Sequence, residues 1–151
     1  MNYATVQDLI DRYGEPDVRR VTDPTAQAVD VTAAQRALDD ADAEIDSWLC
    51  RRYLLPLVDA SGITMAVPRA LIRCACDIAI YRLQTLRPAD DIKDARQRYE
   101  DVLKLLKTMS TGDVAIPGAT LRVDVADVPA SASAGAPEFG SPPSLWGRDN
   151  R

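Results

Sequence analysis

Five carboxylates within residues 39–46 are the side chains of this sequence best suited to chemistry. They are Asp39, Asp40, Asp42, Glu44 and Asp46. Two carboxylates aimed at one atom can act as general acid and general base, and several together can hold a cation. Both roles require the side chains to converge. Their spacing along a helix therefore decides whether they form a site.

On a helix that turns about 100° per residue, these acids spread around the circumference instead of converging. The apolar residues of the same stretch gather within an arc of about 100°. They are Ala34, Leu38, Ala41, Ile45, Trp48 and Leu49. The pattern predicts an amphipathic helix whose acidic residues form a solvated surface. Electrostatic steering and a bound metal ion are the alternatives for the acids.

The other reactive side chains predict a structural protein and not an enzyme. The chain has no histidine, and its cysteines Cys50, Cys74 and Cys76 fall in apolar helical stretches. We expect buried free thiols in a reducing cytoplasm, because a zinc site would need histidine or a second cysteine pair. Arg73 lies one helical turn before Asp77, so these two are expected to form an ion pair. The sequence predicts no catalytic residue, no cofactor and no metal site.

Helical periodicity and capping residues predict a mainly α fold, a small four-helix bundle. The helices are expected at residues 5–13, 32–51, 68–86 and 88–109, with a short helical turn at 16–21. Thr5 is a suitable N-cap for the first, and Thr32 with Gln35 forms a capping-box pattern for the second. Pro68 and Pro88 suit the first position of the last two.

The helix at 68–86 is predicted to be the central one. Its sequence is apolar around most of its circumference, which is typical of a helix covered on several sides. Leu71 and Ile78 are therefore expected to be fully buried.

The composition changes after Gly112, which divides the chain into three predicted parts. Residues 1–112 form the helical bundle. Residues 113–127 alternate around a Pro-Gly turn and can form a short β-hairpin. The strand residues expected to pair are Val114 and Ile116 with Leu121 and Val123. Residues 128–151 are rich in Ala, Ser and Pro and are expected to be an extended docking arm.

The docking arm ends in the residues that we expect to anchor it. Phe139, Leu145 and Trp146 are its large apolar side chains, and Arg148 follows them. Tryptophan and arginine are frequent hot spots of protein interfaces. The dipeptide 142–143 is Pro-Pro, which favours an extended chain and lowers the entropy lost on docking.

Charge is distributed unevenly along the chain, whose net charge is −5. Residues 1–48 carry eleven acids and four bases, whereas residues 49–87 carry two acids and six arginines. A DNA-binding protein would need a net basic surface. The separation instead suits a subunit whose acidic and arginine-rich parts face different neighbours. No apolar run is long enough for a membrane span, and the first residues do not resemble a secretory signal.

Four stretches, in order along nearly the whole chain, resemble the Mu-type prophage neck family of small head–tail joining proteins. They are YATVQDLIDRYG (3–14), ALDDADAEIDSWLCRRYLLPL (37–57), LIRCACDIAIYRLQ (71–84) and SLWGRDN (144–150). The most specific combination is A-E-I-D-x-W-L-x-x-R-Y-x-L-P-L.

The resemblance implies a head-completion adaptor that docks under the portal ring and bridges it to the tail-side stopper protein. Such adaptors form helical bundles that assemble into rings, usually twelve-fold. The expected location is the virion neck, after assembly in the bacterial host cytoplasm. Genomic DNA would pass through the ring without sequence-specific binding, because an acidic channel repels phosphates. The candidate channel-facing acids are Asp39, Asp40, Asp42 and Asp46.

Two other functions are compatible with parts of the sequence. A tail-completion protein, a stopper or a tail terminator, would also belong to the neck, but a β-rich fold is expected for it. A small helical DNA-binding regulator would need a basic recognition helix. The helix predicted at 88–109 carries balanced charges, which disfavours the regulator.

Overall fold

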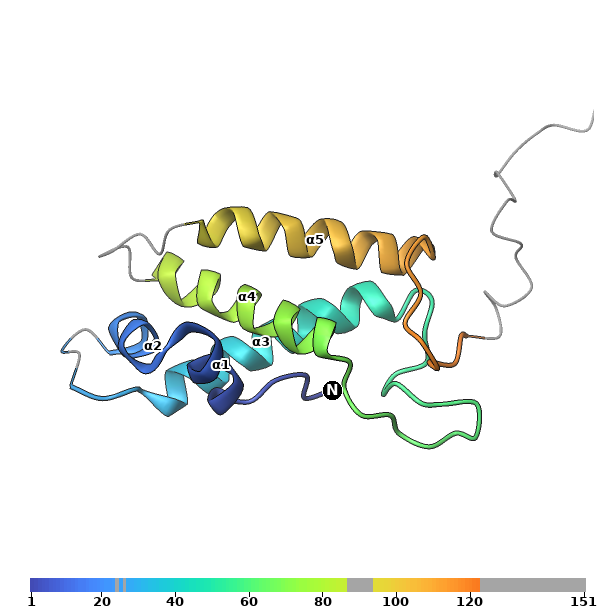
Figure 1. Ribbon diagram of the computed structural model, residues 1–151, viewed down its shortest axis with the longest axis horizontal. Coiled ribbons are helices and arrows are strands. Elements are labelled where there is room, and N and C mark those ends of the chain that lie inside the picture. The colour runs from blue at the N-terminus through green and yellow to red at the C-terminus, as the bar shows by residue number, and fades with distance from the viewer. Residues whose placement is uncertain (24, 26, 87–93, 123–151) are drawn as a thin grey trace, which may run out of the picture.

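The structure is a computed structural model that describes residues 1–23, 25, 27–86 and 94–122. Its helices are α1 (Val6–Tyr13), α2 (Glu15–Thr22), α3 (Val31–Leu49), α4 (Arg69–Leu86) and α5 (Ala95–Thr111). The three long helices pack against one another, and α1 and α2 cover one end of α3 and α4 (Figure 1). The predicted mainly α fold is confirmed. The described part has five helices because residues 15–22 form a full helix where only a turn was predicted.

The first turns of α1 and α3 show how local sequence sets the helix ends. Thr5 caps α1 as predicted: its hydroxyl accepts the N–H of Asp8, whose carboxylate accepts the N–H of Thr5 in return. The predicted start of α3 at Thr32 is wrong. Asp30 is the N-cap there and accepts the N–H of Ala33 at 3.0 Å. A carboxylate two residues earlier takes the place of the capping box expected from Thr32.

The two remaining long helices begin at Arg69 and Ala95. α4 begins at Arg69, and Pro68 precedes it and accepts the N–H groups of Leu71 and Ile72. α5 begins at Ala95 after Asp94, which adopts a left-handed conformation with φ of 66°. The predicted start at Pro88 lies outside the described residues.

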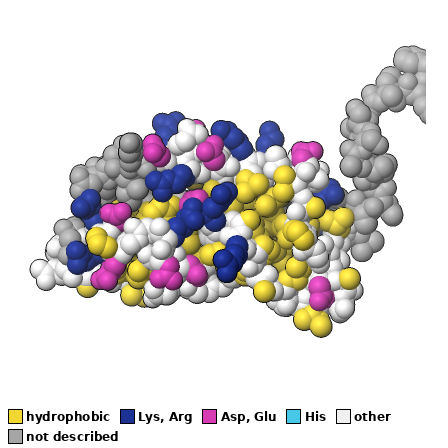
Figure 2. Space-filling view, in the orientation of Figure 1, with side chains coloured by type: hydrophobic (Ala, Val, Ile, Leu, Met, Phe, Trp, Pro, Cys, Tyr) yellow, Lys and Arg dark blue, Asp and Glu magenta, His cyan; other side chains and the backbone are white. Residues whose placement is uncertain are grey.

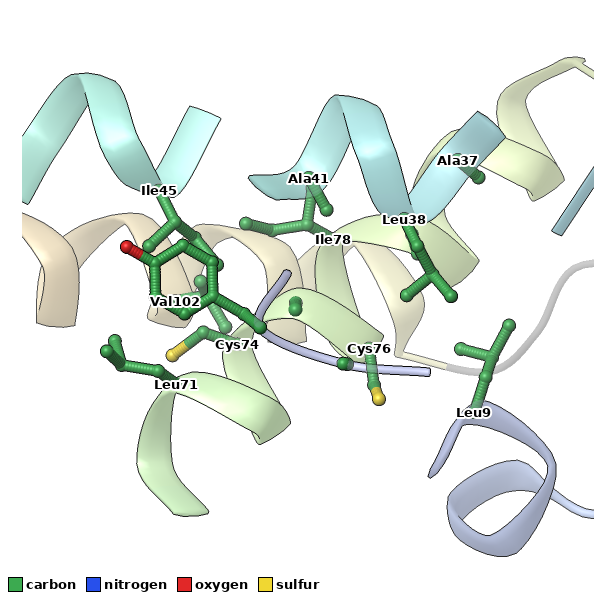
Figure 3. Close-up of a cluster of buried hydrophobic side chains, with 14 of the residues drawn as sticks. Leu9, Ala37, Leu38, Ala41, Ile45, Leu71, Cys74, Cys76, Ile78 and Val102 are labelled. Atoms are coloured by element: carbon green, nitrogen blue, oxygen red, sulfur yellow. The ribbon is translucent and has the colours of Figure 1, made fainter. Parts of the chain in front are cut away.

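The core lies where α3 and α4 face each other, with α1 and α5 closing it (Figure 3). Leu71 and Ile78 of α4 are fully buried, as predicted. Cys74 and Cys76 are buried too, and burial raises the pKa of the Cys76 thiol to about 12. Cys50 contradicts the expectation of three buried thiols. It follows the last residue of α3, where the chain turns to the surface, and is exposed.

Residues 50–67 and 113–122 meet at one end of the bundle (Figure 1). Leu121 forms a bridge with Tyr53, so the predicted pairing of Leu121 with Val114 or Ile116 is wrong. Ile116 is buried instead, and its N–H donates to the Tyr53 hydroxyl at 3.0 Å. Val123 lies outside the described residues. The packed unit therefore continues beyond the boundary predicted at residue 112.

Candidate interaction surfaces

The carboxylates of α3 divide into a structural group and an exposed group. Asp42 is only 8% exposed and accepts the N–H of Tyr3 with both oxygens, each at 3.2 Å. Asp46 accepts the Tyr3 hydroxyl at 2.6 Å and lies 2.8 Å from the amino nitrogen of Met1. These contacts tie the chain before α1 to α3. The solvated position predicted for Asp42 is therefore wrong, because the N-terminal segment covers it.

The surroundings of this contact raise the pKa values of both Asp42 and Tyr3. Burial raises the pKa of Asp42 to about 6, although the N–H of Tyr3 acts in the opposite direction. The nearby carboxylates of Asp46 and Asp39 also raise the Asp42 pKa. Burial above all, and then the hydrogen bond to Asp46, raise the pKa of the Tyr3 phenol. The pair is a stabilising contact with a carboxyl that can titrate near neutral pH.

Asp39 and Asp40 are exposed, as predicted, but they face different surroundings. Asp39 lines an open groove of about 480 Å³ together with Asp42, Asp46 and the first two residues of the chain. The acids at these three positions thus share one groove, whereas the sequence interpretation spread them around the helix. Asp40 lies at a separate pocket between α2, α3 and α4.

Asp77, in the centre of α4, pairs with α1 and not with its helical neighbour. It is 4% exposed, accepts Nε of Arg12 at 2.9 Å and accepts the Tyr13 hydroxyl at 2.6 Å. Burial, followed by the Asp77 contact, raises the pKa of Tyr13 to about 12. The predicted Arg73–Asp77 ion pair is wrong. Arg73 is exposed and lines a cleft of about 390 Å³ between α1 and α4.

A second polar cluster joins the three long helices. Glu44 of α3 accepts Nη2 of Arg82 at 2.6 Å and the hydroxyl of Tyr99 at 2.8 Å. Tyr99 also stacks on Tyr81, with ring centroids 4.4 Å apart. Burial, and then the Glu44 contact, raise the pKa of Tyr99. This fifth acid of the 39–46 stretch therefore holds helices together.

The arginines that follow α3 have distinct positions. Arg51 is exposed, whereas the guanidinium of Arg52 packs over Gly112 and donates to the Thr111 carbonyl at 3.4 Å. Gly112 ends α5 with φ of 94°, a conformation that favours glycine. A side chain at this position would also collide with Arg52. Arg52 thus fixes the end of α5 on residues 50–67, and Arg51 remains available to a neighbour.

Exposed large apolar side chains gather at the two opposite ends of the described bundle, which the sequence interpretation did not predict. Leu54, Ile63 and Val114 lie at the end formed by residues 50–67 and 113–122. Figure 2 shows hydrophobic side chains gathered over that end. Val31 and Leu86 lie at the other end, at the start of α3 and the end of α4. All five lie at the end of a helix or in a segment between helices, which is the signal that the sequence offered.

The end that carries Leu86 also has a pocket of about 250 Å³, which we call the three-helix pocket. Val21, Ala33, Ala37, Leu83 and Leu86 form its apolar lining, together with the polar or charged residues Thr22, Arg36, Asp40 and Arg82. These side chains come from α2, α3 and α4. The pocket is therefore a concave apolar surface with a charged rim.

The structure bears on the expectations for the docking arm, for a metal site and for a membrane span only within the described residues. The arm residues Phe139, Leu145, Trp146 and Arg148 lie outside the described residues. In the part of the chain that the structure covers, no three histidine, cysteine or acidic side chains come together as a metal site would require. None of the described helices has the length and apolar character needed to cross a membrane.

The chain matches the family model described as Bacteriophage Mu, Gp36, over residues 3–133. It is 37% identical over 115 residues to the Mu-like prophage FluMu protein gp36 of Haemophilus influenzae, covering 76% of this chain and 74% of the relative. It is 36% identical over 114 residues to gene product J of Escherichia phage Mu, covering 74% of each. The similarity thus includes the whole described bundle apart from its first two residues. The chain belongs to the bacteriophage Mu Gp36 family of phage and prophage proteins.

Proposed function

We propose that this protein is a structural component of the phage virion, the head-completion adaptor of the neck. In this role it docks under the portal ring and joins the DNA-filled head to the tail-side stopper protein. The observation that carries the proposal is the family match over residues 3–133, which extends across the helical bundle. The mainly helical fold supports an adaptor over a tail-completion protein, for which a β-rich fold is expected.

The surface charges are compatible with a ring around passing DNA. Asp39 is exposed on α3 at the open groove, so it can face a channel, whereas Asp40 is exposed at the three-helix pocket. Like charges repel, and an acidic wall would let phosphates pass without releasing counterions. Asp42 and Asp46 are engaged with the N-terminal segment, and they add negative charge behind the wall. We propose a ring that is twelve-fold, with no sequence-specific contact to DNA.

The docking arm at 128–151 supplies the proposed contact with the portal ring. Trp146 and Arg148 are the proposed anchors, and Phe139 and Leu145 fill adjacent apolar sites. A few buried aromatic and arginine side chains can carry most of the binding energy of an interface. Repetition of one modest contact around a ring would strengthen the attachment through avidity.

The test is to inactivate the gene in the phage or prophage that encodes this chain and to examine induced lysates by electron microscopy. We expect DNA-filled heads and separate, complete tails that do not join. Supplying the intact gene in trans should restore tailed particles. Tails of abnormal length would instead indicate a tail terminator. Normal tailed particles would contradict any role in the neck.

A further inference from the structure

The hairpin at residues 58–64, which we call the connector hairpin, carries an apolar side chain into solvent. Ile63 is 66% exposed. An isolated bridge joins Val58 to Thr64, and the hairpin lies at the end of the molecule away from α2 (Figure 1). Ile63 shares this end of the molecule with the exposed side chains of Leu54 and Val114, and a group of exposed apolar residues is typical of a contact surface.

The connector hairpin is held in one conformation by hydrogen bonds. The Asp59 carboxylate accepts the N–H groups of Ser61 at 2.8 Å and Ile63 at 3.0 Å. The N–H of Asp59 donates to the Ile63 carbonyl at 2.8 Å. Thr120 joins the hairpin to the core by donating its hydroxyl to the Asp59 carbonyl at 2.7 Å. Ile63 is thus presented by a rigid loop, which lowers the entropy lost when it docks.

The three-helix pocket at the opposite end is complementary to this hairpin. Its volume of about 250 Å³ leaves room for an aliphatic side chain, and alanine and leucine side chains form much of its lining. Three charged residues line it, Arg36, Asp40 and Arg82. Arg82 is paired with Glu44, whereas Arg36 is an exposed cation at the rim. The connector hairpin carries a single charge, that of Asp59, which is negative.

We propose that Ile63 of one copy inserts into the three-helix pocket of the next copy. The contact is heterologous, since two different surfaces of the same chain meet. Both surfaces remain available on every copy, so the contact propagates, and it closes into a ring when the rotation between copies allows. Asp59 approaches Arg36 at the rim, which fixes the orientation of the hairpin in the pocket.

This contact deepens the proposed ring and rests on the proposed function for its biological role. It names the two surfaces through which neighbouring copies touch. A single aliphatic side chain in a small pocket gives a weak contact between two free copies. Closure of a ring adds the strength through repetition. The full chain is therefore expected to associate weakly in solution and to be captured by cross-linking.

The first test introduces Ile63→Cys and Ala33→Cys into the full chain with Cys50→Ser, because Cys50 is an exposed thiol. Mild oxidation should give a ladder of disulfide-linked multimers on a non-reducing gel. The control replaces Ile63→Cys by Ala60→Cys, an exposed position in the same hairpin. We expect cross-linking through position 63 to be at least about tenfold faster than through position 60. Equal rates would overturn the proposal.

The second test uses two defects that should complement each other. Ile63→Asp removes the inserting side chain, and Ala33→Trp fills the pocket. In a concentration series followed by sedimentation velocity, each variant alone should associate less than the wild type. An equimolar mixture should form a dimer that does not grow, because one intact hairpin and one intact pocket remain. Failure of the mixture to recover any association would overturn the proposal. Circular dichroism checks that both variants fold.

These outcomes are separate from the test of the proposed function. The neck role is judged by whether heads and tails join in lysates without this protein. Suppose that heads and tails fail to join and that positions 60 and 63 cross-link at equal rates. The first result would support the neck role, and the second would contradict only the proposed contact between copies.

Discussion

The backbone N–H of Tyr3 lies 3.2 Å from both carboxylate oxygens of Asp42, across 39 positions of the sequence. The Tyr3 hydroxyl reaches Asp46 one helical turn further along α3, at 2.6 Å. Tyr3 itself is 2% exposed. Asp42 and Asp46 thus clamp the segment before α1 onto the bundle, and their contribution to stability can be measured.

Asp42→Ala should lower the free energy of unfolding by about 1–3 kcal/mol, because it leaves the buried N–H of Tyr3 without its acceptor. Asp39→Ala, at an exposed position on the same helix, should change it by no more than about 0.5 kcal/mol. Urea unfolding of both variants checks the difference. Equal effects would show that Asp42 is not buried in solution. This replaces the expectation, drawn from the sequence, that Asp42 behaves as a surface residue.

The raised pKa of the Asp42 carboxyl predicts that the free energy of unfolding depends on pH. Its pKa rises from an ordinary value of 3.8 to about 6 on folding. Between these values the folded protein binds more protons at Asp42 than the unfolded chain does. This group therefore lowers the free energy of unfolding as the pH rises from 3.8 to about 6. Below that window its contribution is fully present, and above it the contribution is lost.

Asp42→Asn removes this titration while its side-chain oxygen can still accept the Tyr3 N–H. Relative to the wild type, the variant should therefore gain stability as the pH rises through the window. Unfolding curves at a series of pH values measure the slope. Asp40→Asn, at an exposed position on the same helix, is the matched control and should retain the wild-type slope. A wild-type slope in Asp42→Asn would mean that Asp42 does not titrate in this range.

The partner of Asp77 can be identified by two arginine substitutions. Arg12→Ala should cost about 1.5–3 kcal/mol, because it removes a hydrogen bond to a buried carboxylate. Arg73→Ala should cost no more than about 0.5 kcal/mol, since Arg73 is exposed. Thermal or urea unfolding measures the loss of stability in both variants. A larger loss from Arg73→Ala would restore the ion pair expected from the sequence.

Ile78→Ala should lower the free energy of unfolding by about 2–5 kcal/mol, the usual cost of a cavity left by a buried aliphatic side chain. Ile78 is 0% exposed in the middle of α4. Leu86→Ala, at the exposed end of the same helix, is the control and should cost far less. Similar losses in the two variants would contradict the position of the core.

The role of the docking arm can be tested by two truncations. Ending the chain after Arg122 should leave the melting transition nearly intact yet prevent formation of tailed particles in a complementation assay. Ending it after Gly112 should also destabilise the bundle, because it removes the buried side chain of Ile116. Trp146→Ala alone should weaken joining. Normal tailed particles from the chain ending at Arg122 would show that the arm is dispensable.

The sequence by itself determined the features that repeat along a single helix. The apolar character of the helix around Ile78 predicted that it is buried and central, and Thr5 as a capping residue predicted the start of α1. These signals are local, because helical spacing and capping depend on residues a few positions apart. The order of motifs also indicated the phage family, which the comparisons confirm.

Only the tertiary structure decided which distant groups meet. A helical neighbour, Arg73, was the natural partner for Asp77, but Arg12 is held against it from 65 positions away. The sequence likewise could not show that Tyr3 covers Asp42 or that Leu121 pairs with Tyr53. Packing chooses among partners that have similar local chemistry, because burial excludes water and makes an unpaired charge or N–H costly. The choice of partner depends on how the helices pack together, and the periodicity of a single helix does not determine that packing.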